Sequence, residues 1–302
     1  NYTQFWVHKN SLFLLQSSHL SNELSFKDLI PEPFTAISQA RNSTLTLTEP
    51  WQDQETGLWY SAGTRFKRFS DKDTETFYAI GMIDYVTKKA YAAYVSSSHA
   101  RVEVPLSTTE AKKLYVDLIR GWINQRDGVI PYVWGGCSYI DRCTQNEFLC
   151  VSDTQGKKCW KRSELSHKGA HSGFDCSGLI LRAAQIVGIN YFCKNTSTID
   201  RLLKEVDTQL EEGDLILYKG HVCIVSNVAE NCLIDSYGYS KGYGCLREVR
   251  LSEAFESVAT YNDLIKLHKS KAPLGLKNKD GKTVTTVPSV RLMRLTEHTI
   301  HS

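Results

Sequence analysis

The order in which the second half of the chain combines a helix with strands restricts its fold most strongly. Gly173-Phe-Asp-Cys-Ser-Gly178 runs into the apolar segment 179–187, which predicts a helix. Three strand-like segments follow at 212–218, 220–226 and 232–236, separated by turn residues. Because short turns of this kind join antiparallel neighbours, the pattern predicts an α+β domain in which a helix precedes an antiparallel sheet.

Two further helices are expected. Ser107-Thr-Thr-Glu110 has the form of a capping box, in which the serine accepts from the third backbone N–H and the glutamate reaches back. Apolar residues follow it with a roughly helical period, so we predict a helix over 108–124. Residues 196–206 are predicted to form another short helix.

Residues 1–106 are predicted to be mainly β structure. Strand-like runs occur at 44–48, 76–83, 90–95 and 100–104, and the aromatic-rich segment 57–66 is typical of a small barrel or an array of hairpins. No ordered set of nucleophile, base and orienting group occurs in this half. We therefore interpret it as a recognition module, which leaves the chemistry to the second half.

Composition excludes several functional classes. Hydrophobic residues make up 41% and charged residues 23%, as in an ordinary folded protein. The net charge of +3, without a long Lys/Arg run, does not indicate a nucleic-acid partner. No segment has the roughly 18 consecutive apolar residues of a membrane-spanning helix.

The cysteine count bears on the compartment. Nine cysteines fit one reactive thiol and up to four disulfides, the arithmetic of an exported enzyme. Alternatively, several are small buried side chains in a reducing compartment, which suits Cys223 and Cys232 in their apolar runs. The balance slightly favours an extracytoplasmic location, in the periplasm or cell wall, over the cytoplasm.

Cys176 is the candidate nucleophile. It is expected in the first turn of a helix, where unpaired N–H groups and the helix dipole stabilise a thiolate and lower the pKa of the thiol. Its own backbone N–H is well placed to donate to an oxyanion. A buried cysteine that packs the helix on a sheet is the alternative.

His221 and Asp235 complete a possible catalytic set. His221 begins a strand 45 residues after Cys176, and a neutral imidazole can take the proton of a thiol. Asp235 lies 14 residues further, at the end of the next strand, where its carboxylate could orient the imidazole. A solvated strand terminus and a turn aspartate are the alternatives for these two residues.

Four blocks, in this order, resemble the NlpC-type cell-wall cysteine peptidases of the papain-like superfamily. They are Tyr132-Val-Trp-Gly-Gly136, Phe174-Asp-Cys-Ser-Gly178, Glu212-Gly-Asp-Leu-Ile-Leu-Tyr218 and Gly220-His-Val-Cys-Ile-Val225. The resemblance covers roughly residues 108–268. Members of the family commonly carry bacterial SH3-like barrels upstream, and residues 36–106 are similar to such a module.

The resemblance implies a reaction. It is hydrolysis of the bond between γ-D-glutamate and a diamino acid, usually diaminopimelate, in peptidoglycan stem peptides or muropeptides. Cys176 would attack the carbonyl, and His221 would serve as base and then as acid to the leaving amine. The third position is a polar residue in this family, and Asp235 is the match here. No metal or organic cofactor is required.

The resemblance also implies roles for neighbouring residues. Tyr132 matches a tyrosine that supports the nucleophile and the oxyanion, with core packing as its alternative. Asp175 and Ser177 match substrate-contacting positions, although an aspartate there could equally cap the helix. Trp134 and Asn195 are further candidates for substrate binding. Asn195 stands where the family often has an acidic residue that holds a free amino terminus, so a strict free-amine requirement is less expected.

The insertion 137–172 departs from the family, whose members pass from Trp-Gly-Gly to the nucleophile in about ten residues. It contains four cysteines, and we favour disulfides that hold this long loop together. Zinc binding by Cys143, Cys150, Cys159, His167 and His171 is an alternative, but their spacing matches no common ligand pattern.

The sequence thus predicts a β region over 1–106 with the SH3-like module at about 36–106. A peptidase domain would follow over 107–270, and 271–302 would form a C-terminal extension without an assigned role. A monomer is favoured.

Two rival functions stay open: an amidase or acyltransferase that uses the same Cys–His pair, and a non-catalytic cell-wall-binding protein. Product analysis would distinguish an amidase or acyltransferase from a peptidase. A Cys176 thiol with ordinary reactivity would favour the binding protein.

Overall fold

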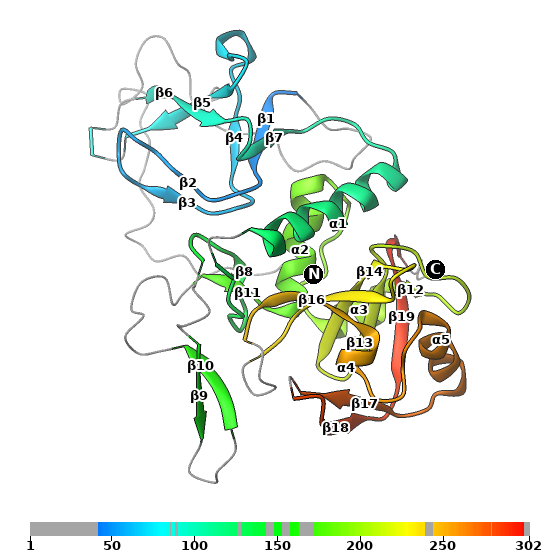
Figure 1. The fold of residues 1–302 in the computed structure, drawn as a ribbon. Coiled ribbons are helices and arrows are strands. Elements are labelled where there is room, and N and C mark those ends of the chain that lie inside the picture. Colours follow the sequence, from blue (N-terminus) through cyan, green and yellow to red (C-terminus); the bar gives the residue numbers. More distant parts are fainter. Residues whose placement is uncertain are drawn as a thin grey trace.

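The computed structural model describes residues 42–84, 86–87, 90–125, 128–142, 148–152, 158–162, 172–238, 244–278 and 280–298. For the strands 148–152 and 158–162 and for residues 297–298, the description covers the backbone alone. The molecule has a β-rich N-terminal region and a larger α+β region, with two helices between the N-terminal strands and the main sheet (Figure 1). The prediction of a mixed fold with helices before an antiparallel sheet is confirmed.

The N-terminal region consists of short antiparallel strands. β1 (Thr44–Leu47) pairs with β4 (Arg65–Lys67) and β7 (Ala100–Val102) in one sheet. Two hairpins accompany this sheet: β2 (Trp51–Gln52) with β3 (Trp59–Tyr60), and β5 (Phe77–Ile83) with β6 (Ala90–Ser96). Their inner side chains form one apolar cluster around Leu45 and Ile80.

The predicted strands of this region are therefore confirmed, but a closed barrel is not shown. The described strands form three separate small sheets. The SH3-like module stays a prediction, and the part of the predicted β region before residue 42 lies outside the described residues.

Helix α1 (Thr108–Asn124) begins and ends where the sequence predicts. Ser107 accepts from the backbone N–H of Glu110, and the Glu110 carboxylate accepts in return from the backbone N–H of Ser107. Its apolar face, including Tyr115, Ile119 and Trp122, is fully buried. The capping box and the apolar period thus define this helix together.

A six-stranded sheet forms the centre of the α+β region, in the order β12-β19-β13-β14-β15-β16. The three predicted strands appear as β13 (Leu215–Tyr218), β14 (His221–Asn227) and β15 (Cys232–Ser236). They form the expected antiparallel meander, which β16 (Leu246–Arg250) extends.

The C-terminal segment contributes an inner strand. β19 (Val290–His298) lies between β12 (Leu203–Glu205) and β13. The apolar residues of this strand belong to the sheet, because Leu292, Met293 and Leu295 are fully buried in its two cores. The predicted helix over 196–206 is shorter than expected, since α3 (Thr196–Leu202) ends where β12 pairs with β19.

The two faces of the sheet are covered differently. α2 (Cys176–Val187) and α1 pack on one face, where Ile180, Val222 and Ile224 share a core. The other face is covered by α4 (Leu251–Ala254), α5 (Tyr261–Ser270) and the hairpin of β17 (Leu274–Lys277) and β18 (Thr283–Val287).

The insertion contains a hairpin of β9 (Phe148–Ser152) and β10 (Lys158–Arg162), which projects from the molecule (Figure 1). Of the four cysteines for which disulfides are predicted, Cys137 is described and is a free thiol. The side chains of the other three, and those of the alternative zinc ligands, lie outside the described residues. The six cysteines that the structure describes with side chains are free thiols: Cys137, Cys176, Cys193, Cys223, Cys232 and Cys245. Nine cysteines would allow up to four disulfides beside one reactive thiol. The three that remain, Cys143, Cys150 and Cys159, allow at most one disulfide among themselves.

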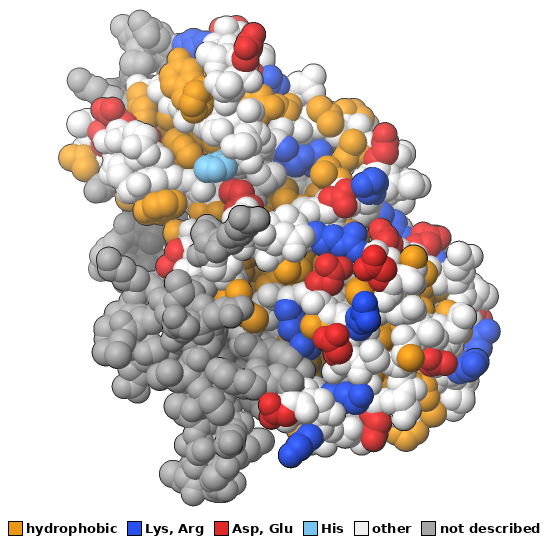
Figure 2. All heavy atoms as spheres, viewed as in Figure 1, with side chains coloured by type: hydrophobic (Ala, Val, Ile, Leu, Met, Phe, Trp, Pro, Cys, Tyr) orange, Lys and Arg blue, Asp and Glu red, His pale blue; other side chains and the backbone are white. Residues whose placement is uncertain are grey.

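The described surface mixes charges of both signs. Lys, Arg, Asp and Glu side chains are interspersed on the face shown in Figure 2, in keeping with the small net charge. Among the described helices, none combines the length and apolar character needed to cross a membrane.

Candidate functional site

The N-terminus of α2 carries Cys176 as its first residue. Asp175 is the N-cap, and its Oδ1 accepts from the backbone N–H of Gly178 at 2.6 Å. Its Oδ2 accepts from the backbone N–H of Gly135 at 3.0 Å, which joins the preceding turn to the helix. Both carboxylate oxygens of Asp175 therefore hold the nucleophile's helix in place, as the capping alternative anticipated.

Three glycines allow this turn and the helix to approach each other. A Cβ added at Gly178 would lie 2.0 Å from the carbonyl oxygen of Gly136, and one at Gly136 would lie 2.4 Å from the carbonyl oxygen of Gly173. Gly173 itself would place a Cβ 2.2 Å from the carbonyl oxygen of Pro131. The glycines on either side of Cys176 are thus required by close backbone contact, which sets the position of the thiol.

The thiol of Cys176 lies against the start of strand β14. The side chain is buried, with 8% exposed, and the backbone N–H of Val222 donates to its sulfur. Burial raises the pKa of the thiol to about 11; the Asp175 carboxylate also raises it, while the N–H groups of Val222 and Ser177 act in the opposite direction. We expected the helix N-terminus to lower the pKa of this thiol, but the loss of water around the sulfur outweighs that effect.

His221 is the first residue of β14 and so precedes the residue that contacts Cys176. The tight turn before it contains Gly220 at φ +80°, a left-handed conformation that favours glycine. The imidazole is half-buried between two tyrosine rings, with centroids 4.5 Å from Tyr237 and 5.3 Å from Tyr218. Apolar rings on two sides restrict the orientations that the imidazole can adopt.

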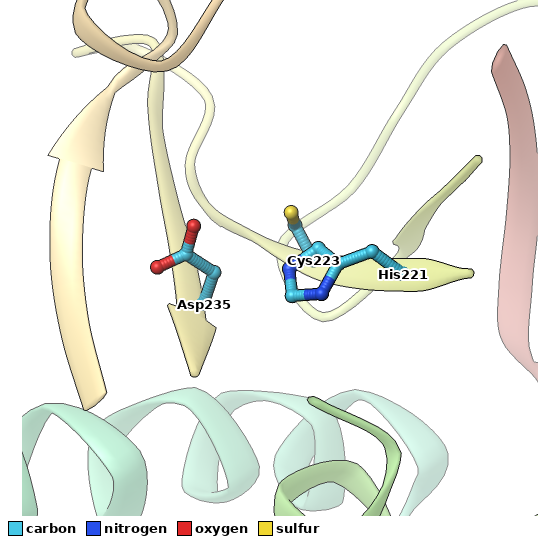
Figure 3. A group of neighbouring side chains, drawn as sticks. All are labelled: His221, Cys223 and Asp235. Atoms are coloured by element: carbon cyan, nitrogen blue, oxygen red, sulfur yellow. The ribbon is translucent and has the colours of Figure 1, made fainter. Parts of the chain in front are cut away.

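Asp235 is almost fully buried, with 2% exposed, on the neighbouring strand β15. Its two carboxylate oxygens accept from Arg247 of β16, at 2.8 Å from Nε and 3.2 Å from Nη2. The ligand atoms of His221, Cys223 and Asp235 all lie within 4.8 Å of one another. Figure 3 shows His221 and Cys223 on one strand and Asp235 facing them from the next.

Two residues of this cluster were not predicted as site residues. Cys223 lies two positions after His221, so the strand period of two could have placed both on one side of the sheet. It was interpreted as a buried apolar residue instead. Arg247 carries no signal in the sequence, because its pairing with Asp235 follows from the register of β15 and β16.

The other predicted site residues are spread around Cys176. Trp134 is 75% exposed, so it does not form part of the core. Tyr132 is half-buried, and its ring would lie 3.5 Å from a Cβ at Gly238. Ser177 is buried and donates to the carbonyl oxygen of Lys194 at 2.7 Å. Asn195 is the exposed N-cap of α3, and its Oδ1 accepts from the backbone N–H of Thr198 at 2.8 Å. Their roles in binding substrate stay predictions.

A charged cleft of about 360 Å³ opens beside the turn that precedes His221. Tyr218, Lys219 and Gly220 line it from the sheet, Thr196 and Asp200 line it from α3, and Arg291 lines it from β19. Small polar groups could therefore approach the start of β14 from this side.

Comparison with known proteins gives weak similarity. No protein-family model matches the sequence, and no curated protein does. An NlpC/P60 family protein from Bacillus cereus ATCC 10987 aligns with a TM-score of 0.46 and 16% identity, over 70% of this chain and 59% of that structure. The peptidoglycan hydrolase RipB from Mycobacterium tuberculosis aligns with a TM-score of 0.33 and 17% identity, over 63% of this chain and 66% of that structure. The function proposed below rests on the residues of this chain.

Proposed function

We propose that this chain is a cell-wall cysteine peptidase that hydrolyses the bond between γ-D-glutamate and a diamino acid in peptidoglycan stem peptides. One observation carries the proposal: the thiol of Cys176, at the first position of α2, lies against the backbone of Val222, the residue that follows His221. The four sequence blocks that resemble NlpC-type peptidases supply the substrate class.

In this proposal Cys176 forms a covalent intermediate. The sulfur attacks the γ-carbonyl carbon while His221 takes the thiol proton, and the oxyanion accepts a hydrogen bond from the backbone N–H of Cys176. His221 then gives the proton to the leaving amine as the C–N bond breaks, which leaves a thioester. Water attacks the thioester with His221 again as base, and the products are a free γ-carboxylate and the thiol.

The resting thiol affects how the first step runs. Because burial raises its pKa to about 11, Cys176 holds its proton before substrate binds, and the proton must leave during the attack. A slow reaction of the resting thiol would therefore not by itself identify a non-catalytic binding protein. Product formation is the measurement that separates the two functions.

Asp235 and Tyr132 serve as positioning residues in this proposal. Asp235, held by Arg247, faces the imidazole side of β14 and would favour one tautomer of His221. Tyr132, close to Gly238, would support the oxyanion. Exposed Trp134 would offer a flat apolar surface to the substrate, and the region 36–106 would act as a recognition module for muropeptides.

Mass spectrometry of L-Ala-γ-D-Glu-diaminopimelate incubated with the full chain tests the proposal. We expect the wild type to release diaminopimelate and the Cys176→Ala variant to release none. Cys193→Ala is the matched control, because Cys193 is another buried thiol of the same core, with 2% exposed, and it should retain activity.

Three outcomes would count against the proposal. Release by Cys176→Ala would exclude this nucleophile. Release of diaminopimelate with the L-Ala-γ-D-Glu acyl group recovered on another acceptor, and not as the free acid, would favour an acyltransferase. If the folded wild type released no diaminopimelate from this tripeptide and none from longer stem peptides, the peptidase assignment would be wrong.

A further inference from the structure

A nitrogen, a sulfur and an oxygen donor converge on one side of the central sheet. They come from His221, Cys223 and Asp235, and the three ligand atoms lie within 4.8 Å of one another (Figure 3). We propose that these three side chains form a binding site for a divalent cation of the zinc type. Cys223 has no role in the peptidase reaction proposed above, whereas His221 and Asp235 would serve both that reaction and the ion.

The sheet itself brings the donors together. His221 and Cys223 are two residues apart on β14, and strand residues two apart project to the same side. Ile224 pairs with Ile234, so the next position along the ladder sets Asp235 beside Cys223. Both strands are inner strands of the six-stranded sheet, which makes the backbone of the site rigid.

The distances suit an ion after small side-chain movements. Bond lengths of about 2.0–2.3 Å at a tetrahedral zinc place neighbouring donor atoms roughly 3.5 Å apart. The ligand atoms lie within 4.8 Å of one another, so they would have to approach by about 1 Å to bind the ion. Small rotations about the side-chain χ angles can supply this movement. Three protein donors would leave a fourth position for water.

The donor set selects the ion. Magnesium and calcium take oxygen ligands almost exclusively, whereas zinc accepts imidazole, thiolate and carboxylate together. Arg247 holds both oxygens of Asp235 and would keep the carboxylate oriented when one oxygen also binds the ion. Binding replaces the thiol proton of Cys223 with the metal, so each ion bound releases a proton.

Cobalt provides a direct readout, because a thiolate bound to Co²⁺ gives a charge-transfer absorption band that nitrogen and oxygen ligands do not give. The full chain with Cys176→Ser removes the proposed nucleophile's thiol from the measurement. We expect this variant to develop the band with Co²⁺ and to lose it when Zn²⁺ is added. Adding Cys223→Ala should abolish the band and weaken Zn²⁺ binding in equilibrium dialysis by at least about tenfold.

Two further variants make the result specific. Cys176→Ser with Cys193→Ala removes a buried thiol of the opposite core and should keep the band. Cys176→Ser with His221→Ala should lose it without opening a cavity at Cys223. A band whose intensity Cys223→Ala leaves unchanged, or no band in the Cys176→Ser chain with native circular dichroism, would overturn the proposal.

One consequence rests on the proposed function: an ion at this site would occupy His221 and so stop the peptidase. Zn²⁺ should then inhibit product release, and a chelator should restore it. The two failures are distinguishable, because the Co²⁺ band needs no substrate and the product assay can be run in chelator. A peptidase without the band contradicts only the metal site, and a band without peptidase activity contradicts only the proposed function.

Discussion

At the scale of single residues, the protonation state of Cys176 is set by two opposing effects. The helix N-terminus and the N–H of Val222 favour a thiolate, while burial and the Asp175 carboxylate favour the thiol. Burial prevails and raises the pKa from the ordinary value of 9.0 to about 11. The thiolate fraction at neutral pH is then roughly a hundredfold lower than for an ordinary cysteine.

We therefore predict that iodoacetamide alkylates Cys176 slowly in the native chain at pH 7. Because a raised pKa keeps the thiol protonated until higher pH, the rate should increase about tenfold per pH unit up to about 11. Peptide mass spectrometry after timed alkylation measures this rate at Cys176 alone.

The urea-unfolded chain is the control, since its Cys176 should be alkylated faster at pH 7 and level off near pH 9. A native rate that is already maximal at pH 7 would mean that the resting enzyme holds a thiolate–imidazolium pair instead.

At the scale of elements, the approach of the 135–136 turn to α2 depends on a missing side chain. A Cβ at Gly178 would lie 2.0 Å from the carbonyl oxygen of Gly136, which is backbone and cannot rotate away. We predict that Gly178→Ala lowers the free energy of unfolding by roughly 1–3 kcal/mol, as overpacked sites do. Urea denaturation measures the change, and peptidase activity should fall with it because the turn positions the nucleophile.

Gly121→Ala is the matched control within a helix. Gly121 is exposed in α1, and a Cβ there would meet nothing within 4 Å, so the substitution should stabilise the chain by roughly 0.5–1 kcal/mol. Equal effects of the two substitutions would show that helix propensity, and not the close contact with Gly136, determines the result at Gly178.

Elements with local signals could be predicted from the sequence. The capping box at Ser107 fixed the start of α1, and short turns identified the meander of β13, β14 and β15. The position of β19 beside β13 could not be foreseen, because that pairing joins residues more than seventy positions apart. The contact of Arg247 with Asp235 could not be foreseen either, because it depends on the register in which β15 pairs with β16.

At the scale of the whole molecule, the N-terminal strands are docked on the helical side of the α+β region. The indole N–H of Trp122 in α1 donates to the carbonyl oxygen of Thr48 at 2.8 Å. Ser138 donates to the carbonyl oxygen of Ala62 at 2.7 Å, and Arg101 donates to that of Ile186 at 2.8 Å. These contacts involve backbone carbonyls from both regions, so the two regions should unfold together.

Glu49 joins the two regions most directly. It accepts from Gln125 at 2.6 Å, from the hydroxyl of Tyr139, and from Arg142 at 3.4 Å. The Arg142 side chain is only 6% exposed, so removal of the carboxylate would leave a largely buried cation and a hydroxyl without this acceptor. We predict that Glu49→Ala lowers the free energy of unfolding by roughly 1–3 kcal/mol.

Asp117→Ala is the comparison, because it breaks the 2.8 Å ion pair with Lys113 on the exposed face of α1 and should leave the unfolding midpoint unchanged. Tryptophan fluorescence during urea unfolding reports on the six tryptophans of the chain, which include Trp51 in the N-terminal region and Trp122 in α1. Circular dichroism follows the helices. For Glu49→Ala we expect the fluorescence transition to separate from the circular dichroism transition and to move to lower urea, because the docked strands lose their main charged contact. Coincident and unshifted transitions would mean that the apolar contacts at Ala62 and the backbone hydrogen bonds hold the regions together without Glu49.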